Sequence, residues 1–158
     1  WFPRVFLTDS VIYLKDEAET LNLIKSSIFN PGRNSILTRD LSNLHLNSSG
    51  SEIEIDNWSP EKIQISVKVQ DTCLLALSEG YYPPGWNAYI DGNKTEIFQT
   101  NHFMQSVVVP TGDHKVEFRF ALPSFNRALI ISRTIFIAVL ITLLGYGIWM
   151  NRQGLKLA

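Results

Sequence analysis

One loop of this 158-residue chain concentrates side chains that suit carbohydrate recognition. Residues 78–86 run Ser-Glu-Gly-Tyr-Tyr-Pro-Pro-Gly-Trp. Exposed Tyr and Trp rings can stack on sugar rings, and a carboxylate can accept hydrogen bonds from sugar hydroxyls. Prolines lower the entropy cost of fixing such a loop. We therefore take Glu79, Tyr81, Tyr82 and Trp86 as candidate substrate-binding residues, which face the membrane side of the domain or an active-site cavity of a larger protein.

The same loop also has a purely structural interpretation. Tyr82 and Trp86 can close the end of a β-sandwich, while the prolines stiffen the connection. The two interpretations differ in what Trp86→Ala does. Loss of a core Trp destabilises a domain by about 3–5 kcal/mol, whereas loss of a ligand contact leaves its stability nearly unchanged.

Patterns typical of other chemistry are missing from the sequence. It contains no Gly-rich phosphate loop, no His-x-x-x-His pair and no Ser/His/Asp pattern with a nucleophile elbow. Its histidines, His45, His102 and His114, are isolated, so we predict loop or turn residues rather than metal ligands. The single cysteine, Cys73, excludes an intrachain disulfide and a Cys-based zinc cluster. We predict no catalytic residue, no metal and no cofactor in this chain.

The charge balance argues against a nucleic-acid partner. The 14 Lys and Arg residues nearly match the 15 Asp and Glu residues, for a formal net charge of -1. Proteins that bind nucleic acid normally carry a basic surplus on one face.

A long apolar run near the C-terminus predicts a membrane-spanning helix. Residues 134–150 carry no charge, and with residues 128–132 the helix reaches about 35 Å, more than the roughly 30 Å of a hydrocarbon core. Arg133 can extend its stem to the headgroups, and Tyr146 and Trp149 suit the opposite interface. The alternative, a buried helix of a soluble protein, requires a larger domain around a helix that is apolar on every face.

The region before this helix shows the periodicity of an antiparallel β domain. Ile53 and Ile55 alternate with acids, and residues 63–69 alternate between apolar and polar, so one face of each strand is expected to be buried. Residues 73–77 are continuously apolar and predict a central strand. We expect further strands at 4–7, 11–14, 35–38, 86–90, 95–98, 107–109 and 115–120, with turns at 8–10, 57–60, 91–94 and 110–113 and a polar loop at 43–51. The predicted fold is mainly β, an antiparallel β-sandwich or jelly-roll-like domain with one short N-terminal helix, followed by a C-terminal transmembrane helix.

The short helix is expected over residues 17–28. Asp16 precedes Glu19 by three residues, as at a capped helix start. A helical stripe follows, formed by Ala18, Leu21, Ile24 and Ile28. The Asn-Pro-Gly sequence at 30–32 ends it.

The second half of the domain resembles the C-terminal portion of the bacterial membrane protein family YfhO. The resemblance covers nearly the whole chain and is densest over residues 76–125. It rests on a loop, a hairpin, a turn and a linker, through Ser78, Glu79, Tyr82, Pro83, Gly85, Trp86, Asp91, Gly92, Asn101, Phe103, Val109, Pro110, Gly112, His114, Val116, Phe118, Pro123, Ser124 and Phe125. The chain departs from the family pattern in its double proline, Pro83-Pro84, and in Arg127, where a small residue is common.

The resemblance implies a large polytopic protein similar to C-type membrane glycosyltransferases. Such proteins use a polyprenyl-phosphate-linked sugar outside the cytoplasm and decorate cell-surface polymers such as teichoic acids. Their catalytic acid is expected in an early extracytoplasmic loop, outside this chain, so no catalytic residue is carried over. The expected partners are the lipid bilayer, the remaining membrane helices of the parent protein, the polyprenyl-phosphate sugar and a cell-surface polymer.

These inferences predict three parts: an extracytoplasmic β-sandwich at 1–126, a transmembrane helix at 127–150 and a short cytoplasmic tail at 151–158. Charge does not decide the orientation, because Arg127 and Arg133 balance Arg152 and Lys156. The orientation follows from the resemblance. A stand-alone, membrane-anchored carbohydrate-binding or adhesion module is the alternative function, and further hydrophobic spans upstream of residue 1 would distinguish the two.

Overall fold

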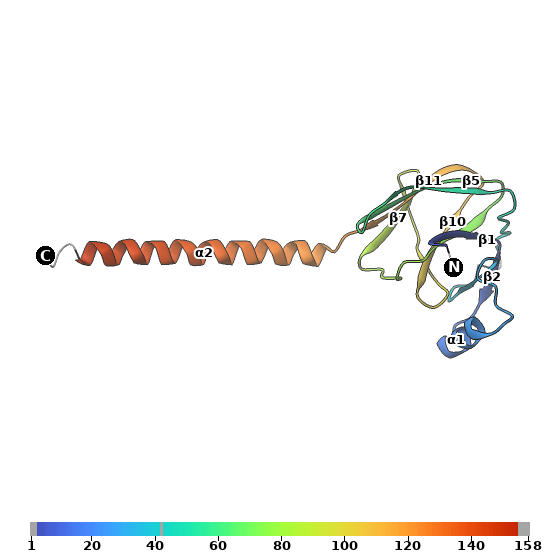
Figure 1. Ribbon diagram of the computed structural model, residues 1–158, viewed down its shortest axis with the longest axis horizontal. Helices are drawn as coiled ribbons and strands as arrows, with labels where there is room; N and C mark the ends of the chain where they lie inside the picture. Colours follow the sequence, from blue (N-terminus) through green and yellow to red (C-terminus); the bar gives the residue numbers. More distant parts are fainter. Residues whose placement is uncertain (1–2, 42, 155–158) are drawn as a thin grey trace. The chain divides into compact units, whose positions relative to one another are not determined.

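The computed structural model describes residues 3–41 and 43–154, with the side chains of 123, 126 and 151–154 left aside. The chain separates into two compact units, Trp1–Ala121 and Leu122–Ala158. The first unit is mainly β with one short helix, and the second contains an apolar helix (Figure 1). The predicted fold class is therefore confirmed. The predicted division at residues 126 and 150 stays a prediction.

The β unit is built from two sheets. The six-stranded sheet has the order β1-β6-β10-β9-β3-β2, and the five-stranded sheet has the order β4-β5-β11-β7-β8. Figure 1 shows β5, β7 and β11 in one layer and β1 and β10 in the other. The strand bounds are β1 Val5–Thr8, β2 Ser10–Tyr13, β3 Asn34–Leu37, β4 Glu52–Trp58, β5 Lys62–Val69, β6 Cys73–Leu77, β7 Trp86–Ile90, β8 Asn93–Thr95, β9 Phe98–Thr100, β10 Met104–Val109 and β11 Gly112–Phe120.

The main core lies between the sheets and follows the alternation seen in the sequence. On β5 every second side chain is buried, and β11 contributes Val116 and Phe118 to the same core. Strand β6 is buried at all five positions, because it is covered on both faces. Leu75 and Leu77 belong to the core between the sheets, while Leu74 packs with Leu37 in a smaller cluster on the other face. The prediction that residues 73–77 form a central strand is confirmed.

Two predicted turns connect strands that do not pair with each other. Strands β1 and β2 are the first and last in the order of the six-stranded sheet and do not pair with each other, since β1 pairs with β6 and β2 runs parallel to β3. Because only Asp9 separates them, the two ends of this order meet at Asp9. The turn predicted at 8–10 does lie between β1 and β2, but these strands pair with other strands. Residues 110–113 likewise form no hairpin, because β10 belongs to one sheet and β11 to the other. The loop at 110–113 therefore crosses between the two sheets.

Two further predictions need correction. The helix α1 runs over Glu17–Lys25, with the Asp16 side chain accepting a hydrogen bond from the backbone of Glu19 as expected. It ends at Lys25, three residues earlier than predicted, with Ser26 as its C-cap, and Ile28 is exposed. Strand β4 is exposed at Ile53 and Ile55 instead of burying them, because it is the last strand of its sheet.

The second unit contains one helix, α2, over Pro123–Gly154. Its stretch Arg127–Met150 has a mean hydropathy of 2.3, and none of it is buried against the rest of the chain. The Thr134 and Thr142 hydroxyls donate to carbonyl oxygens one turn earlier, each at 2.8 Å, so neither needs water as a partner. By length and composition this helix can cross a bilayer.

Candidate functional site

The aromatic loop predicted from sequence connects β6 to β7 and is tied down by main-chain hydrogen bonds. The backbone N–H of Tyr81 donates to the carbonyl of Phe103 at 2.6 Å. Both Gly85 and Trp86 donate to the carbonyl of Tyr82, at 2.9 and 3.0 Å, and the carbonyl of Gly85 accepts from Ala121 at 2.8 Å. The loop therefore has a defined shape before any ligand arrives.

Phe120, the last residue of β11, is the side chain on which this loop rests. Its ring centroid lies 5.2 Å from that of Trp86, in an edge-to-face arrangement, and 6.4 Å from that of Tyr82. A Cβ on Gly85 would come within 2.3 Å of the Phe120 ring. Position 85 therefore needs a glycine, because the ring occupies the space that any side chain would fill.

The four predicted site residues differ in what they offer a ligand. Trp86 is 9% exposed and belongs to the main core, whereas Tyr82 is 49% exposed. Glu79 and Tyr81 are partly buried. The ring of Tyr82 is thus the largest ligand-accessible surface of the four, and Trp86 supports it through Phe120. The sequence analysis missed Phe120 because it belongs to the apolar alternation of a strand.

An apolar hollow of about 400 Å³ lies beside the start of this loop. Ser78 lines it, together with Phe103 and Met104 from the following hairpin and Leu21 and Ile24 from α1. Phe103 is itself exposed. The hollow therefore offers an apolar surface next to the first residue of the loop.

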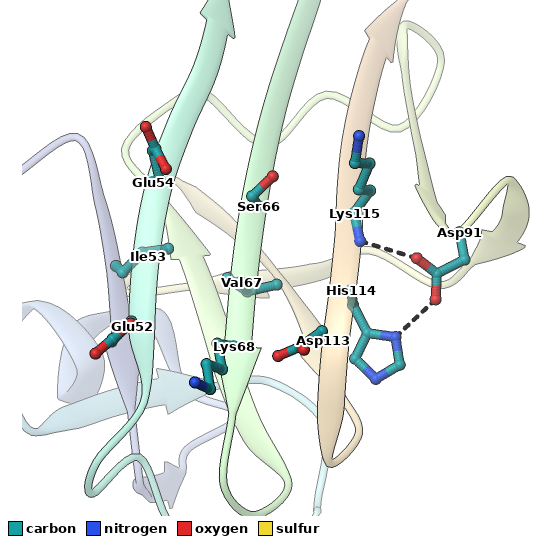
Figure 2. A pocket seen from close by; sticks show the side chains of 10 residues that line it. All are labelled: Glu52, Ile53, Glu54, Ser66, Val67, Lys68, Asp91, Asp113, His114 and Lys115. Carbon is teal, nitrogen blue, oxygen red and sulfur yellow. Dashed lines mark hydrogen bonds and ion pairs between the residues drawn. The ribbon is translucent and has the colours of Figure 1, made fainter.

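A second polar arrangement lies at the β7–β8 turn, beside the start of β11 (Figure 2). Nδ1 of His114 lies 2.6 Å from Oδ2 of Asp91, and its Nε2 lies 3.2 Å from the carbonyl oxygen of Thr111. The backbone N–H of Lys115 donates to Oδ1 of Asp91 at 2.8 Å. These contacts join the start of β11 to the hairpin beside it.

The electrostatics of this pair follow from its geometry. Both neighbours of the imidazole are acceptors, so the two ring nitrogens can donate at the same time only when the ring is protonated. The hydrogen bond to Asp91 accordingly raises the pKa of His114 above 6.5, and the same bond lowers the pKa of Asp91 below 3.8. Both ring nitrogens are engaged, so the pair joins the β7–β8 turn to the turn that precedes β11.

The backbone around the pair explains several motif residues. Asp91 and Gly92 have φ angles of 51° and 82°, as a two-residue turn between β7 and β8 requires. Gly112 has a φ of 129°, and a Cβ there would lie 3.0 Å from Nε2 of His114. Isolated in the sequence, His114 meets Asp91 only because β7 and β11 are neighbours.

The other histidines are more loosely placed. His102 lies 3.5 Å from a carboxylate oxygen of Glu17, and His45 lies 4.0 Å from Asp71. Over residues 3–41 and 43–154, no three His, Cys, Asp or Glu side chains are grouped so that they could hold a metal ion.

The model of the family described as bacterial membrane protein YfhO matches residues 26–132, more than half of the chain. The chain belongs to the YfhO family. The match begins directly after α1, covers β3 to β11 and extends into α2, so it includes the aromatic loop and the Asp91–His114 pair. No curated protein and no solved structure matches the chain.

Membership in the YfhO family places the chain among bacterial membrane proteins, in agreement with the apolar stretch of α2. Several residues of the family resemblance now have structural roles. Gly85 makes room for Phe120, Gly112 makes room for His114, and Asp91 fixes the turn that receives it. Tyr82 differs from these three, because much of its ring faces solvent.

Proposed function

We propose that this chain is the extracytoplasmic C-terminal domain and last membrane helix of a YfhO-family glycosyltransferase. In this proposal the parent protein transfers a sugar from a polyprenyl-phosphate carrier to a cell-surface polymer. The family match supports the membrane context, and the resemblance supports the chemistry and the side of the membrane. The domain positions substrate or acceptor, while the parent protein supplies the catalytic group.

One observation carries the positioning role, namely a half-exposed Tyr82 ring on a loop that is already fixed. The backbone N–H groups of Gly85 and Trp86 hold the carbonyl of Tyr82 in place by hydrogen bonds. The ring of Phe120 lies next to the ring of Tyr82. A preformed aromatic surface binds a sugar without a further ordering cost. Glu79 and Tyr81 are partly accessible on the same loop and supply polar contacts.

The test compares activity with folding in the full-length protein. Tyr82→Ala is expected to lower sugar transfer at least tenfold while leaving the melting transition of the domain nearly unchanged, and Glu79→Ala and Tyr81→Ala to lower it to a lesser degree. Trp86→Ala is the structural control, because loss of this core side chain costs about 3–5 kcal/mol. If Tyr82→Ala unfolds the domain, and Glu79→Ala and Tyr81→Ala leave activity intact, the loop is structural only.

The same proposal predicts that residues 1–158 alone are inactive. Sugar transfer needs a positioned acid or base, and the one tightly paired histidine has both ring nitrogens engaged. Turnover of a polyprenyl-phosphate sugar by the purified chain would refute this. A membrane-anchored carbohydrate-binding module is the second candidate function, since the accessible Tyr82 ring suits glycan binding equally well. This second function predicts that the chain binds glycans and that the full-length protein does not transfer sugar.

A further inference from the structure

Strand β4 (Glu52–Trp58) is an edge strand with an uncovered side. It pairs only with β5, and six of its seven residues are exposed. The opposite edge of the same sheet, β8, is three residues long. Proteins usually keep exposed edges short or covered, because the free N–H and C=O groups of an edge can pair with another strand.

The side chains of β4 that face the core are not covered. Ile53 pairs with Val67 and Ile55 pairs with Ile65, and both of these β5 partners are buried in the main core. Cross-strand partners point to the same face of a sheet. Ile53 and Ile55 therefore lie on the core face, yet they are 37% and 45% exposed. The core-facing side chains of β5 are therefore buried, whereas those of β4 at Ile53 and Ile55 remain exposed to solvent.

The other end of the strand is covered. The Trp58 ring packs against the main core, and the Arg4 guanidinium lies 4.7 Å from its centroid. The register of β4 against β5 also shifts between Ile55 and Asn57. The regular, uncovered edge is therefore the segment Glu52–Ile55.

The outer face of this segment is acidic. Glu52 pairs with Lys68 and Glu54 pairs with Ser66, so both glutamates point away from the core (Figure 2). In that view β4 is the outermost strand, and a new strand would lie directly beside the two carboxylates. A second copy of β4 is disfavoured there, because any register that joins the isoleucines also places acidic side chains opposite acidic side chains.

We propose that β4 accepts an added strand from a partner polypeptide in which apolar residues alternate with Lys or Arg. The apolar residues would cover Ile53 and Ile55 on the core face, and the basic residues would pair with Glu52 and Glu54 on the outer face. Main-chain hydrogen bonds to the free edge supply affinity, and the alternating side chains supply specificity. This interaction surface is independent of the proposed sugar-positioning role.

The experiment uses the full chain in detergent and fluorescent synthetic peptides. The probe alternates lysine and valine over seven residues, and its matched control alternates glutamate and valine. Fluorescence anisotropy is expected to show binding of the lysine peptide and none of the glutamate peptide. A lysine peptide methylated at alternate backbone nitrogens, which cannot form the strand pairing, is expected to lose binding.

A charge reversal supplies the decisive variant. Glu52→Lys/Glu54→Lys is expected to lower the affinity for the lysine peptide at least about tenfold, because two cross-strand ion pairs become repulsive. The same variant is expected to bind the glutamate peptide. Glu61→Lys/Glu96→Lys, which changes exposed acids outside this edge, is the matched control and is expected to bind as the wild type does. Both variants should melt close to the wild type, because all four side chains are exposed and the exposed ion pair of Glu96 with Arg39, which the control loses, contributes little to stability.

Four results would overturn the proposal. The first is that the lysine peptide fails to bind at millimolar concentration. The second is that it binds the Glu52→Lys/Glu54→Lys variant as well as it binds the wild type. The third is that the backbone-methylated peptide binds as tightly as the parent peptide. The fourth is concentration-dependent dimerisation of the chain that the charge reversal abolishes, which would make a second copy the occupant.

Discussion

Gly85→Ala tests the packing that positions the aromatic loop. The added Cβ would lie 2.3 Å from Cε2 of Phe120, 2.8 Å from Cζ and 2.9 Å from Cδ2. Ordinary carbon contacts lie at about 3.5–4.0 Å, so the ring or the loop must move by about 1.2 Å or more. The loop resists this movement because the N–H of Gly85 donates to Tyr82 and its carbonyl accepts from Ala121.

Overpacking of this kind costs about 1–3 kcal/mol. For a domain of this size, each kcal/mol lowers the melting temperature by about 3–6 °C. Thermal unfolding of the full chain, followed by near-ultraviolet circular dichroism, is therefore expected to show Gly85→Ala melting roughly 3–18 °C below the wild type. Gly80→Ala is the matched control, because no atom lies within 4 Å of its added Cβ, and it is expected to melt with the wild type.

A double variant identifies the contact itself. Phe120→Leu shortens the ring that the new methyl group meets, so Gly85→Ala is expected to cost less in the Phe120→Leu background, with a coupling of about 1 kcal/mol or more. If Gly85→Ala melts with the wild type, or costs the same in both backgrounds, Phe120 does not hold the loop in the way described.

Three further predictions concern buried and paired groups. The hydrogen-bonded pair of His114 and Asp91 is expected to stabilise the domain fully between about pH 4 and 6.5. Its contribution falls as the pH rises through the raised pKa of His114, and it also falls as the pH drops through the lowered pKa of Asp91. Denaturant midpoints measured from pH 4 to 9 should therefore decline above pH 6.5 in the wild type and not in His114→Asn, and equal slopes in the two proteins would contradict this. Burial, with a smaller contribution from Asp71, raises the pKa of Cys73 to about 11, so a thiol reagent at pH 8 should label this cysteine only after unfolding; rapid labelling of the native chain would show that the strand is open. Gln105 is fully buried, and its side-chain amide has no hydrogen-bond partner among the described residues, so Gln105→Leu is expected to raise the free energy of unfolding by about 1–3 kcal/mol in urea titrations, and a loss of stability would show that the amide is satisfied.

The sequence predicted those features of the fold that depend on local periodicity. Alternation along residues 63–69 matches β5, and the unbroken apolar run at 73–77 matches a strand covered on both faces. The Asp16 cap and the Asp91-Gly92 turn were also visible, because both depend on neighbouring residues.

Features that depend on strand order were not predictable. Alternation at Ile53 and Ile55 shows which face points inward, but it does not show that the other sheet leaves this edge open. The loop at 110–113 has the composition of a hairpin, and only the pairing of β10 with β6 and of β11 with β5 reveals a crossing between sheets. The candidate site was found from its composition, whereas the support from Phe120 required the register of β11 beside β7.

The orientation of the β unit is the claim on which the proposed function most depends. Cysteine labelling in intact bacteria tests it most directly, with Lys94→Cys at the exposed β7–β8 hairpin, Ala158→Cys at the end of the chain, and Cys73→Ala in both, in a full-length protein without other cysteines. In the proposed orientation, a membrane-impermeant maleimide labels Lys94→Cys in intact cells and Ala158→Cys only after permeabilisation. Labelling of Ala158→Cys in intact cells, with Lys94→Cys protected, would contradict it.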